Sequence, residues 1–126
     1  MASESNIQSY RDLYVWQKAM DMVVECYKLT EKLPASETYG LTSSIRRGCV
    51  LVPSYIADGK GRDTVGEYLN KLSGASGSLK LLETHLLVVD RLKYLPMSEI
   101  EPSLDLCDQV GKMLTKLAQS LRGGRS

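Results

Sequence analysis

Apolar residues recur at alternating steps of three and four in four long segments, and this period constrains the fold more than any other feature of the sequence. The segments cover about residues 13–33, 38–59, 64–94 and 98–121. None of them sustains the alternation of apolar and polar residues that a half-buried strand shows. The connections between them are short, which favours antiparallel packing of successive helices. The sequence therefore predicts a single all-α domain over residues 1–126, folded as an antiparallel up-down-up-down four-helix bundle.

The first segment carries two apolar stripes along one broad face. The stripe interpreted as the main seam consists of Leu13, Trp16, Met20, Val23, Tyr27 and Thr30. The stripe beside it consists of Val15, Ala19, Met22, Cys26, Leu29 and Leu33. We expect this helix to pack against more than one neighbour, with Asp12 as its N-cap and Pro34 after its end. The seams of the other segments are Leu41, Ile45, Gly48, Val52 and Ile56, then Leu72, Ala75, Leu79, Leu82, Leu86 and Val89, and finally Ile100, Leu104, Cys107, Gly111, Leu114, Leu117 and Leu121.

Proline, glycine and serine residues mark special positions in the later segments. Pro53 lies inside the second segment, where its missing backbone donor and its clash with the preceding turn predict a kink. The glycine-rich residues 58–61 are expected to end that helix. The small residues 74–78 lower helix propensity but let another helix approach closely, so we predict a close helix crossing there. Ser98 and Glu101 have the spacing of a capping box at the start of the fourth helix.

Composition excludes several classes of protein. With 16 Lys and Arg against 15 Asp and Glu, the formal net charge is +1, far from the basic balance of a dedicated nucleic-acid binder. The first residues lack the pattern of a signal peptide, and no apolar stretch approaches the roughly 20 residues that span a bilayer. Three widely spaced cysteines, Cys26, Cys49 and Cys107, do not form a disulfide framework. We expect a cytoplasmic protein with reduced thiols and flexible ends at residues 1–11 and 122–126.

Several motifs follow one another in order between residues 10 and 95. An aromatic residue, Asp-Leu and Val-Trp precede the first helix, and a Pro and a Glu are followed by Tyr-Gly-Leu and paired arginines. Pro-Ser, Ile-Ala, an acid-Gly pair and Arg come next, and Gly-Ser-Leu followed by Glu and Leu ends the series. The positions are Tyr10, Asp12, Leu13, Val15, Trp16, Ala19, Pro34, Glu37, Tyr39, Gly40, Leu41, Arg46, Arg47, Pro53, Ser54, Ile56, Ala57, Asp58, Gly59, Arg62, Gly77, Ser78, Leu79, Glu83 and Leu86. Through them the chain resembles the bacterial four-helix-bundle family named for intervening sequences in 23S ribosomal RNA genes.

This resemblance implies a four-helix bundle that assembles into a homopentameric ring. The chain departs from the family pattern at polar positions, because a usual glutamine, asparagine and glutamate are Ser44, Tyr55 and Leu81 here. A further glutamate is shortened to Asp58. If those polar groups form a functional site in other members, this chain lacks it. A relative, the accessory protein of diversity-generating retroelements, is strongly basic and binds nucleic acid and a reverse transcriptase, whereas this chain has no such excess of positive charge.

Arg46 and Arg47, together with Lys60 and Arg62, form the densest basic cluster in the sequence. Such side chains can contact phosphates through charge and forked hydrogen bonds. Helix-surface arginines more often pair with acids of a neighbouring helix or protomer. Both interpretations stay open for these four residues: contact with RNA or DNA, or ion pairing and contact with a protein partner.

The chain has seven tyrosines and no phenylalanine. Tyrosine suits an interface that has one apolar side and one wet end. Tyr10, Tyr14 and Tyr39 lie off the main seams, so a four-helix core alone does not require them. They are our candidates for an oligomer interface, and packing at the ends of the bundle is the equal alternative.

No motif predicts catalysis, a metal or a cofactor. His85 is the single histidine, and Leu82 stands three residues before it, where a di-iron bundle has glutamate. The cysteines do not form the close pairs of a zinc site. Residues 59–61 lack the longer glycine loop and the following Ser or Thr of a phosphate-binding loop.

The interpretation that fits these features best is a non-enzymatic, oligomeric bundle that binds a macromolecular partner. It uses no cofactor, no metal and no small-molecule substrate. The alternative is an RNA- or DNA-binding protein that acts through Arg46, Arg47, Lys60 and Arg62.

Overall fold

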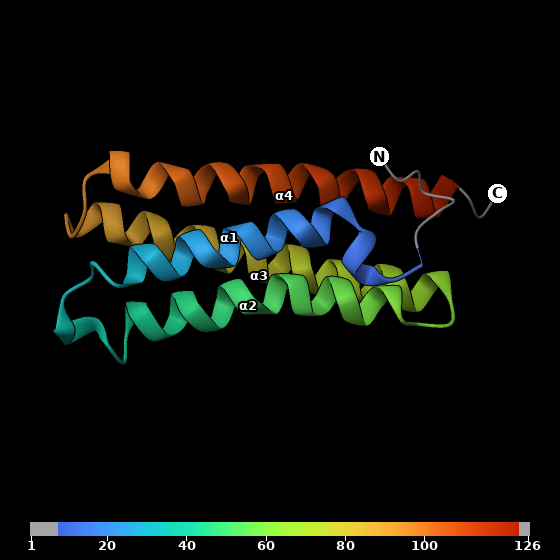
Figure 1. Ribbon diagram of the computed structural model, residues 1–126, viewed down its shortest axis with the longest axis horizontal. Coiled ribbons are helices and arrows are strands. Elements are labelled where there is room, and N and C mark those ends of the chain that lie inside the picture. Colours follow the sequence, from blue (N-terminus) through green and yellow to red (C-terminus); the bar gives the residue numbers. More distant parts are fainter. Residues whose placement is uncertain (1–7, 124–126) are drawn as a thin grey trace.

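A computed structural model describes residues 8–123 of the chain as four antiparallel helices (Figure 1). They are α1 (Tyr14–Thr30), α2 (Leu41–Lys60), α3 (Val65–Arg91) and α4 (Met97–Gly123). Two short 3-10 helices, η2 (Tyr10–Asp12) and η3 (Ala35–Glu37), precede α1 and α2. No strand occurs among the described residues. The predicted all-α bundle is confirmed, whereas the pentameric ring stays a prediction.

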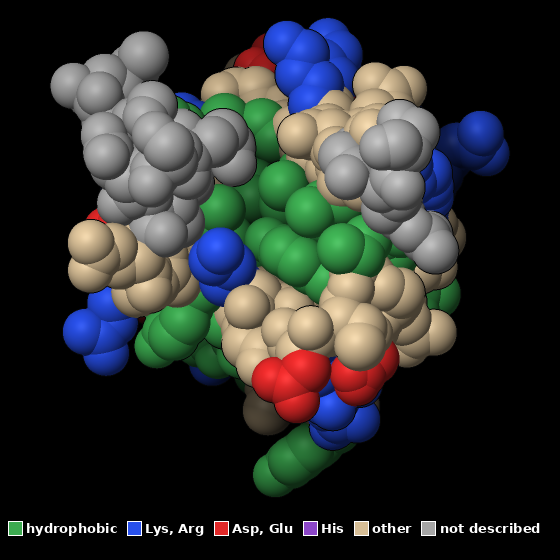
Figure 2. Space-filling model, turned by 90° about the vertical axis from the view of Figure 1, so that its right-hand side faces the viewer, with side chains coloured by type: hydrophobic (Ala, Val, Ile, Leu, Met, Phe, Trp, Pro, Cys, Tyr) green, Lys and Arg blue, Asp and Glu red, His purple; other side chains and the backbone are tan. Residues whose placement is uncertain are grey.

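Each helix packs against two neighbours, which gives the bundle four sides. α1 contacts α2 and α4, and α3 contacts the same two helices, so α1 and α3 lie diagonally across the core. The sides are named below by their helix pairs, for example the α3–α4 side. Figure 2 looks onto the end where α2 leads into α3 and shows hydrophobic side chains at the centre, with most charged side chains toward the rim.

The core is one cluster of buried side chains from all four helices and the start of the chain. It consists of Leu13, Val15, Ala19, Met22, Cys26, Leu29, Ile45, Cys49, Val52, Ile56, Leu72, Ala75, Leu79, Leu82, Leu86, Val89, Ile100, Cys107, Val110 and Leu114. All six residues of the predicted α3 seam belong to it. The burial of these aliphatic side chains is the main force that holds the helices together.

The α1 stripe that begins at Leu13 is buried only in part, at Leu13 and Thr30. The stripe that starts at Val15 faces the bundle axis, while Met20 and Tyr27 of the other stripe are 40% and 38% exposed. The two stripes lie side by side on the helix, so both have the right period. Only the simultaneous contact of α1 with α2 and α4 decides which stripe points inward.

Two predicted helix caps are wrong. The carboxylate of Asp12 accepts hydrogen bonds from the backbone N–H groups of Gln8 and Ser9 and completes a capping box for η2, and α1 starts at Tyr14 without a side-chain cap. α4 begins at Met97, so Ser98 lies inside its first turn. The side chain of Thr64 caps α3 by accepting from the Glu67 N–H at 3.1 Å. Short polar side chains compete for the same role near a helix start, and backbone geometry selects among them.

Pro53 is buried inside α2, which continues through it from Leu41 to Lys60 (Figure 1). α1 ends at Thr30, before Pro34, which is followed by η3. The ends predicted to be flexible, 1–11 and 122–126, lie partly outside the described residues. None of the helices described is long and apolar enough to cross a membrane.

The predicted close helix crossing lies between α2 and α3 and is confirmed at Gly74. A Cβ atom at Gly74 would come within 2.9 Å of the Tyr55 ring, and one at Gly59 within 2.9 Å of the Tyr68 ring. A Cβ at Gly77 would meet nothing within 4 Å, so this glycine does not serve the crossing. The absence of side chains at Gly59 and Gly74 therefore sets the separation of α2 and α3.

Candidate interaction surfaces

Large hydrophobic side chains are exposed around α2. The set that we call the α2-side surface is Met20 (40% exposed), Val24 (54%), Tyr27 (38%), Val50 (41%), Leu51 (40%) and Leu81 (62%). Within residues 8–123, α4 contributes no large hydrophobic side chain of this exposure. Large apolar side chains exposed on one part of a small bundle often mark a contact with another molecule.

One flank of this surface lies on the α1–α2 side. The guanidinium carbon of Arg46 on α2 is 4.9 Å from the centroid of the Tyr27 ring on α1. Arg46 Nε also donates a hydrogen bond of 2.9 Å to Thr30 Oγ1. Val50 follows Arg46 by one helical turn and therefore faces the same side.

The other flank lies on the α2–α3 side. The Tyr55 ring fills the space above Gly74, which shows that both residues face the seam between α2 and α3. Leu51 precedes Tyr55 by one turn, and Leu81 follows Gly74 by two turns. These two leucines therefore border the same seam from opposite helices.

The outer face of α2 is poor in charge. Between Leu41 and Ala57, Arg46 and Arg47 are the only charged residues. Arg46 is half-buried against Tyr27, and Arg47 is exposed. Most exposed positions of α4 are by contrast charged or polar, and include Glu101, Asp105, Asp108, Lys112 and Lys116. The bundle thus has an apolar exterior at α2 and a charged exterior at α4.

The four basic residues singled out in the sequence do not form one cluster. Arg47 and Lys60 are 13 residues apart on α2, which is about 20 Å along a helix. Arg47 contacts Ser43 at 3.4 Å, and Arg62 forms an ion pair of 2.9 Å with Asp58. Burial acts to raise the pKa of Asp58, but hydrogen bonds and the charges of Arg62 and a neighbouring lysine outweigh it and hold that pKa below its usual value. Phosphate contact would thus compete with an existing ion pair at Arg62.

The three tyrosines proposed for an interface lie in separate places. The Tyr10 ring packs edge-to-face on Trp16, with 5.3 Å between the ring centroids. Tyr14 lines a hollow of about 310 Å³ on the α1–α4 side, next to Met113 and Leu117. Tyr39 is 96% exposed in the connection before α2. None of them belongs to the α2-side surface.

The three cysteines and the histidine lie wholly or partly inside the bundle. Cys26, Cys49 and Cys107 are buried free thiols. Burial raises the pKa of Cys107 to about 12, and a hydrogen bond with Cys49 and burial raise that of Cys26, so both thiols stay protonated at neutral pH. His85 is half-buried, and its Nδ1 has no hydrogen-bond partner among the described residues. No group of three metal-binding side chains occurs in the part of the chain that the structure describes.

Sequence reasoning missed the residues of the α2-side surface. Val50 and Leu51 both lie off the predicted seam of this segment, so the helical period places them away from the core. The residues from Gly48 to Ala57 contain no charge, although part of this stretch must face outward. The seam of this helix accounts for only part of this uncharged run. The length of the run could therefore have indicated that some of its apolar side chains are exposed.

The fold agrees with comparisons to other proteins. The sequence profile of the 23S rRNA-intervening sequence protein family matches residues 11–116. No curated protein matches the chain. The chain is similar to the crystal structure of a protein of unknown function from the S23 ribosomal protein family of Bacteroides thetaiotaomicron, with a TM-score of 0.75 and 19% identity over 82% of this chain and 97% of the other. At this identity the structural likeness supports the fold. Because the family profile covers most of its length, the chain belongs to the 23S rRNA-intervening sequence protein family.

Proposed function

We propose that this protein is a non-enzymatic assembly or adaptor module that associates with copies of itself and binds a macromolecular partner. The observation that carries the proposal is the α2-side surface, where six large hydrophobic side chains are 38% to 62% exposed. Burial of such side chains in a contact between copies releases water from apolar surface and favours association.

The backbone of the same region suits close contact with another helix. Gly48 on α2 and Gly77 on α3 each have open space where a side chain would lie. Residues without side chains let a neighbouring chain approach the helix backbone. The low charge of α2 also reduces the cost of removing this face from water.

The resemblance to the family favours a closed ring of five copies. A ring requires a head-to-tail contact in which two different surfaces of each copy meet. Tyr14 and the hollow beside it lie on the α1–α4 side, away from the α2-side surface. They are therefore suited to be the second surface, in agreement with the expectation that Tyr14 belongs to an interface.

Light scattering coupled to size-exclusion chromatography tests the self-association. We expect a mass several times the 14.0 kDa of one chain, and five times that mass for the ring. A stable monomer at micromolar concentration would refute the proposal.

The alternative function is RNA or DNA binding through Arg46, Arg47, Lys60 and Arg62. The structure supports this alternative less than it supports self-association, because Arg46 already contacts Tyr27 and Arg62 already pairs with Asp58. Anisotropy titrations with labelled single-stranded and duplex RNA at low and moderate salt distinguish the two, since phosphate binding weakens steeply with salt. Affinity that is lost in Arg47→Ala with Lys60→Ala would support the alternative.

A further inference from the structure

A groove runs along the α3–α4 side of the bundle, opposite the α1–α2 side. It consists of two hollows of about 240 Å³ and 730 Å³ that share Ser76 and Thr115 in their linings. We call their combined lining the α3–α4 groove. On α3 it extends from residue 69 to residue 83. Fourteen residues correspond to about 21 Å along a helix, or four turns.

The floor of the groove is aliphatic. Leu69, Leu72 and Ala118 line one hollow, and Leu79 lines the other. Gly111 has no side chain to fill the space above Leu79, whose Cδ2 would be 3.4 Å from a Cβ atom at that position. The glycine therefore keeps the groove open at its middle.

The rim of the groove carries more positive than negative charge. Lys80, Lys112, Lys116 and Arg122 line it, against Glu83 and Asp108 as the acids. The acids are already engaged, since Lys80 lies 3.5 Å from Glu83 and Lys112 lies 3.0 Å from Asp108. Lys116 and Arg122 have no ion-pair partner within residues 8–123.

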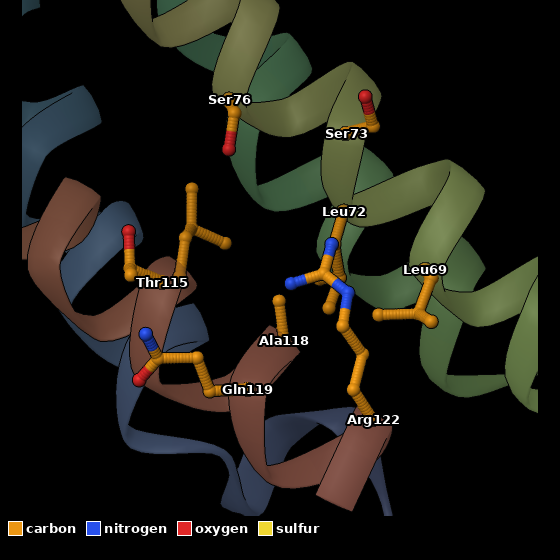
Figure 3. Close-up of a pocket in the computed structure, with 9 residues that line it drawn as sticks. Leu69, Leu72, Ser73, Ser76, Thr115, Ala118, Gln119 and Arg122 are labelled. Carbon is orange, nitrogen blue, oxygen red and sulfur yellow. The ribbon is translucent and has the colours of Figure 1, made fainter. Parts of the chain in front are cut away.

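Arg122 occupies a distinctive place at one end of the groove. Figure 3 shows its side chain reaching from the last turn of α4 toward Leu72, so that the guanidinium lies between α3 and α4. The side chain of Ser76 points into the same space, whereas that of Ser73 points away from it. A guanidinium placed beside an aliphatic floor is suited to a carboxylate on an otherwise apolar ligand.

We propose that the α3–α4 groove binds an acidic amphipathic helix of a partner protein. Such a helix of about four turns would lay its apolar face on the aliphatic floor and direct Asp and Glu side chains to the cationic rim. The inference rests on the proposed adaptor function and names the class of its partner. The groove and the α2-side surface have no residue in common, so association of copies through the α2-side surface does not use the groove lining.

The lining favours a helix over a nucleic acid. No aromatic side chain lines the groove, so bases would have no stacking platform. Glu83 and Asp108 would face a phosphate backbone at one end. The aliphatic floor contributes to binding only if the ligand presents apolar side chains of its own.

The test uses the full chain and a fluorescein-labelled synthetic peptide of about 14 residues, long enough for four helical turns. The peptide has Leu at every third or fourth position and Glu on both flanks. A second peptide has Lys at each Glu position. Fluorescence anisotropy should show saturable binding of the acidic peptide and none of the basic one. Equal binding of the two peptides, or no binding of the acidic one, would overturn the proposal.

Charge reversal locates the site. Lys116→Glu with Arg122→Glu should weaken binding by about tenfold or more, as expected when two partly exposed charge pairs become repulsive. The matched control is Arg47→Glu with Lys60→Glu, an equal change of charge on α2, which should leave the affinity unchanged. Circular dichroism of both variants checks that the helices are intact. Retained affinity in the groove variant would place the peptide elsewhere and reject the groove as its site.

A filling variant and an RNA probe separate the remaining outcomes. Gly111→Leu adds apolar volume without charge and should also weaken binding by closing the middle of the groove. The RNA probe is polyuridine. If it binds the wild type but not the groove variant, and the acidic peptide does not bind, the groove is a nucleic-acid site and the inference is refuted.

Light scattering of the same samples reports self-association separately. An oligomer that fails to bind the peptide refutes the groove, and a monomer that binds it refutes the proposed assembly.

Discussion

The hydroxyl of Tyr94 donates a hydrogen bond of 2.8 Å to the carboxylate of Glu37, which joins the connection after α3 to η3 before α2. The other carboxylate oxygen of Glu37 accepts the Leu41 N–H at 3.0 Å, at the first residue of α2. Glu37 therefore ties one end of the bundle together and caps a helix from outside it. Two hydrogen bonds hold the pKa of Glu37 below its usual value. The bond from the Leu41 backbone N–H has the larger effect, and the bond from the Tyr94 hydroxyl has the smaller one.

We expect Glu37→Gln to make stability less dependent on pH. A carboxyl group whose pKa is lowered by folding stabilises the protein at a pH above its unfolded pKa, about 4.3 for Glu, and this stabilisation is lost as the pH falls through the lower folded value. The melting temperature of the variant should therefore be below that of the wild type at pH 7, and the difference should shrink toward pH 3. Thermal unfolding followed by circular dichroism measures it, and a difference that stays constant over this range would contradict the role of the carboxylate.

The hydrogen bond itself is tested by Tyr94→Phe, which removes only the donating hydroxyl. We expect a lower melting temperature at pH 7 because Glu37 loses one of its two partners. Tyr39→Phe is the matched control, since that ring is 96% exposed and the same atom is removed. Equal melting temperatures for the two variants would show that the Tyr94 hydroxyl adds nothing to stability.

Two glycines that both lie in helices should respond in opposite ways to replacement by alanine. Gly59→Ala places a methyl group 2.9 Å from Tyr68 Cδ1 and 3.1 Å from Lys71 Cβ. Overpacking of this kind costs about 1–3 kcal/mol. Gly77→Ala meets no neighbour within 4 Å. It should stabilise the helix by up to about 1 kcal/mol through propensity.

Urea unfolding measures both changes in the free energy of unfolding. Destabilisation of similar size by the two substitutions would show that helix propensity and packing at these sites are wrongly assigned.

The α2-side surface should control the oligomeric state. Leu51→Glu with Leu81→Glu places two charges on exposed apolar positions and should shift the assembly toward the monomer, because an unpaired charge is costly to bury. Leu87→Glu is the control, since Leu87 is 47% exposed on α3 but outside this surface. Light scattering gives the mass of each variant, and an unchanged mass of the double variant would assign the contact to another surface.

The thiols should be unreactive in the folded protein. All three cysteines are buried, and burial raises the pKa of Cys107 to about 12. A hydrogen bond with Cys26 lowers the pKa of Cys49, so burial alone protects that thiol. A thiol reagent at pH 8 should therefore label the native chain slowly and the urea-unfolded chain at once, since the thiolate is the reactive form. Fast labelling of one cysteine in the native state would reveal local opening around that residue.

The regular apolar period was enough to predict the four helices, and the short connections between them predicted their antiparallel order. The same is true of the α3 seam, whose six residues from Leu72 to Val89 are all buried. In that segment one stripe alone is continuous, so the period leaves no choice of inner face. The small residue Gly74 likewise indicated a close helix crossing, because a missing side chain lets two helices approach, and the structure identified α2 as the partner.

Tertiary contacts decided which face of each helix points inward and which residues lie near one another, because the helical period alone leaves both open. α1 carries two valid stripes, and packing against α2 and α4 together turned Val15 rather than Trp16 toward the axis. Arg47 and Lys60 belong to one helix yet lie about 20 Å apart, so the basic residues predicted to form one cluster are separated in space. The partnership of Glu37 with Tyr94 spans 57 residues. The sequence by itself determined which segments become helices, through local propensity and periodicity, and only the folded bundle decided which of their faces stay exposed, because exposure depends on how all four helices pack at once.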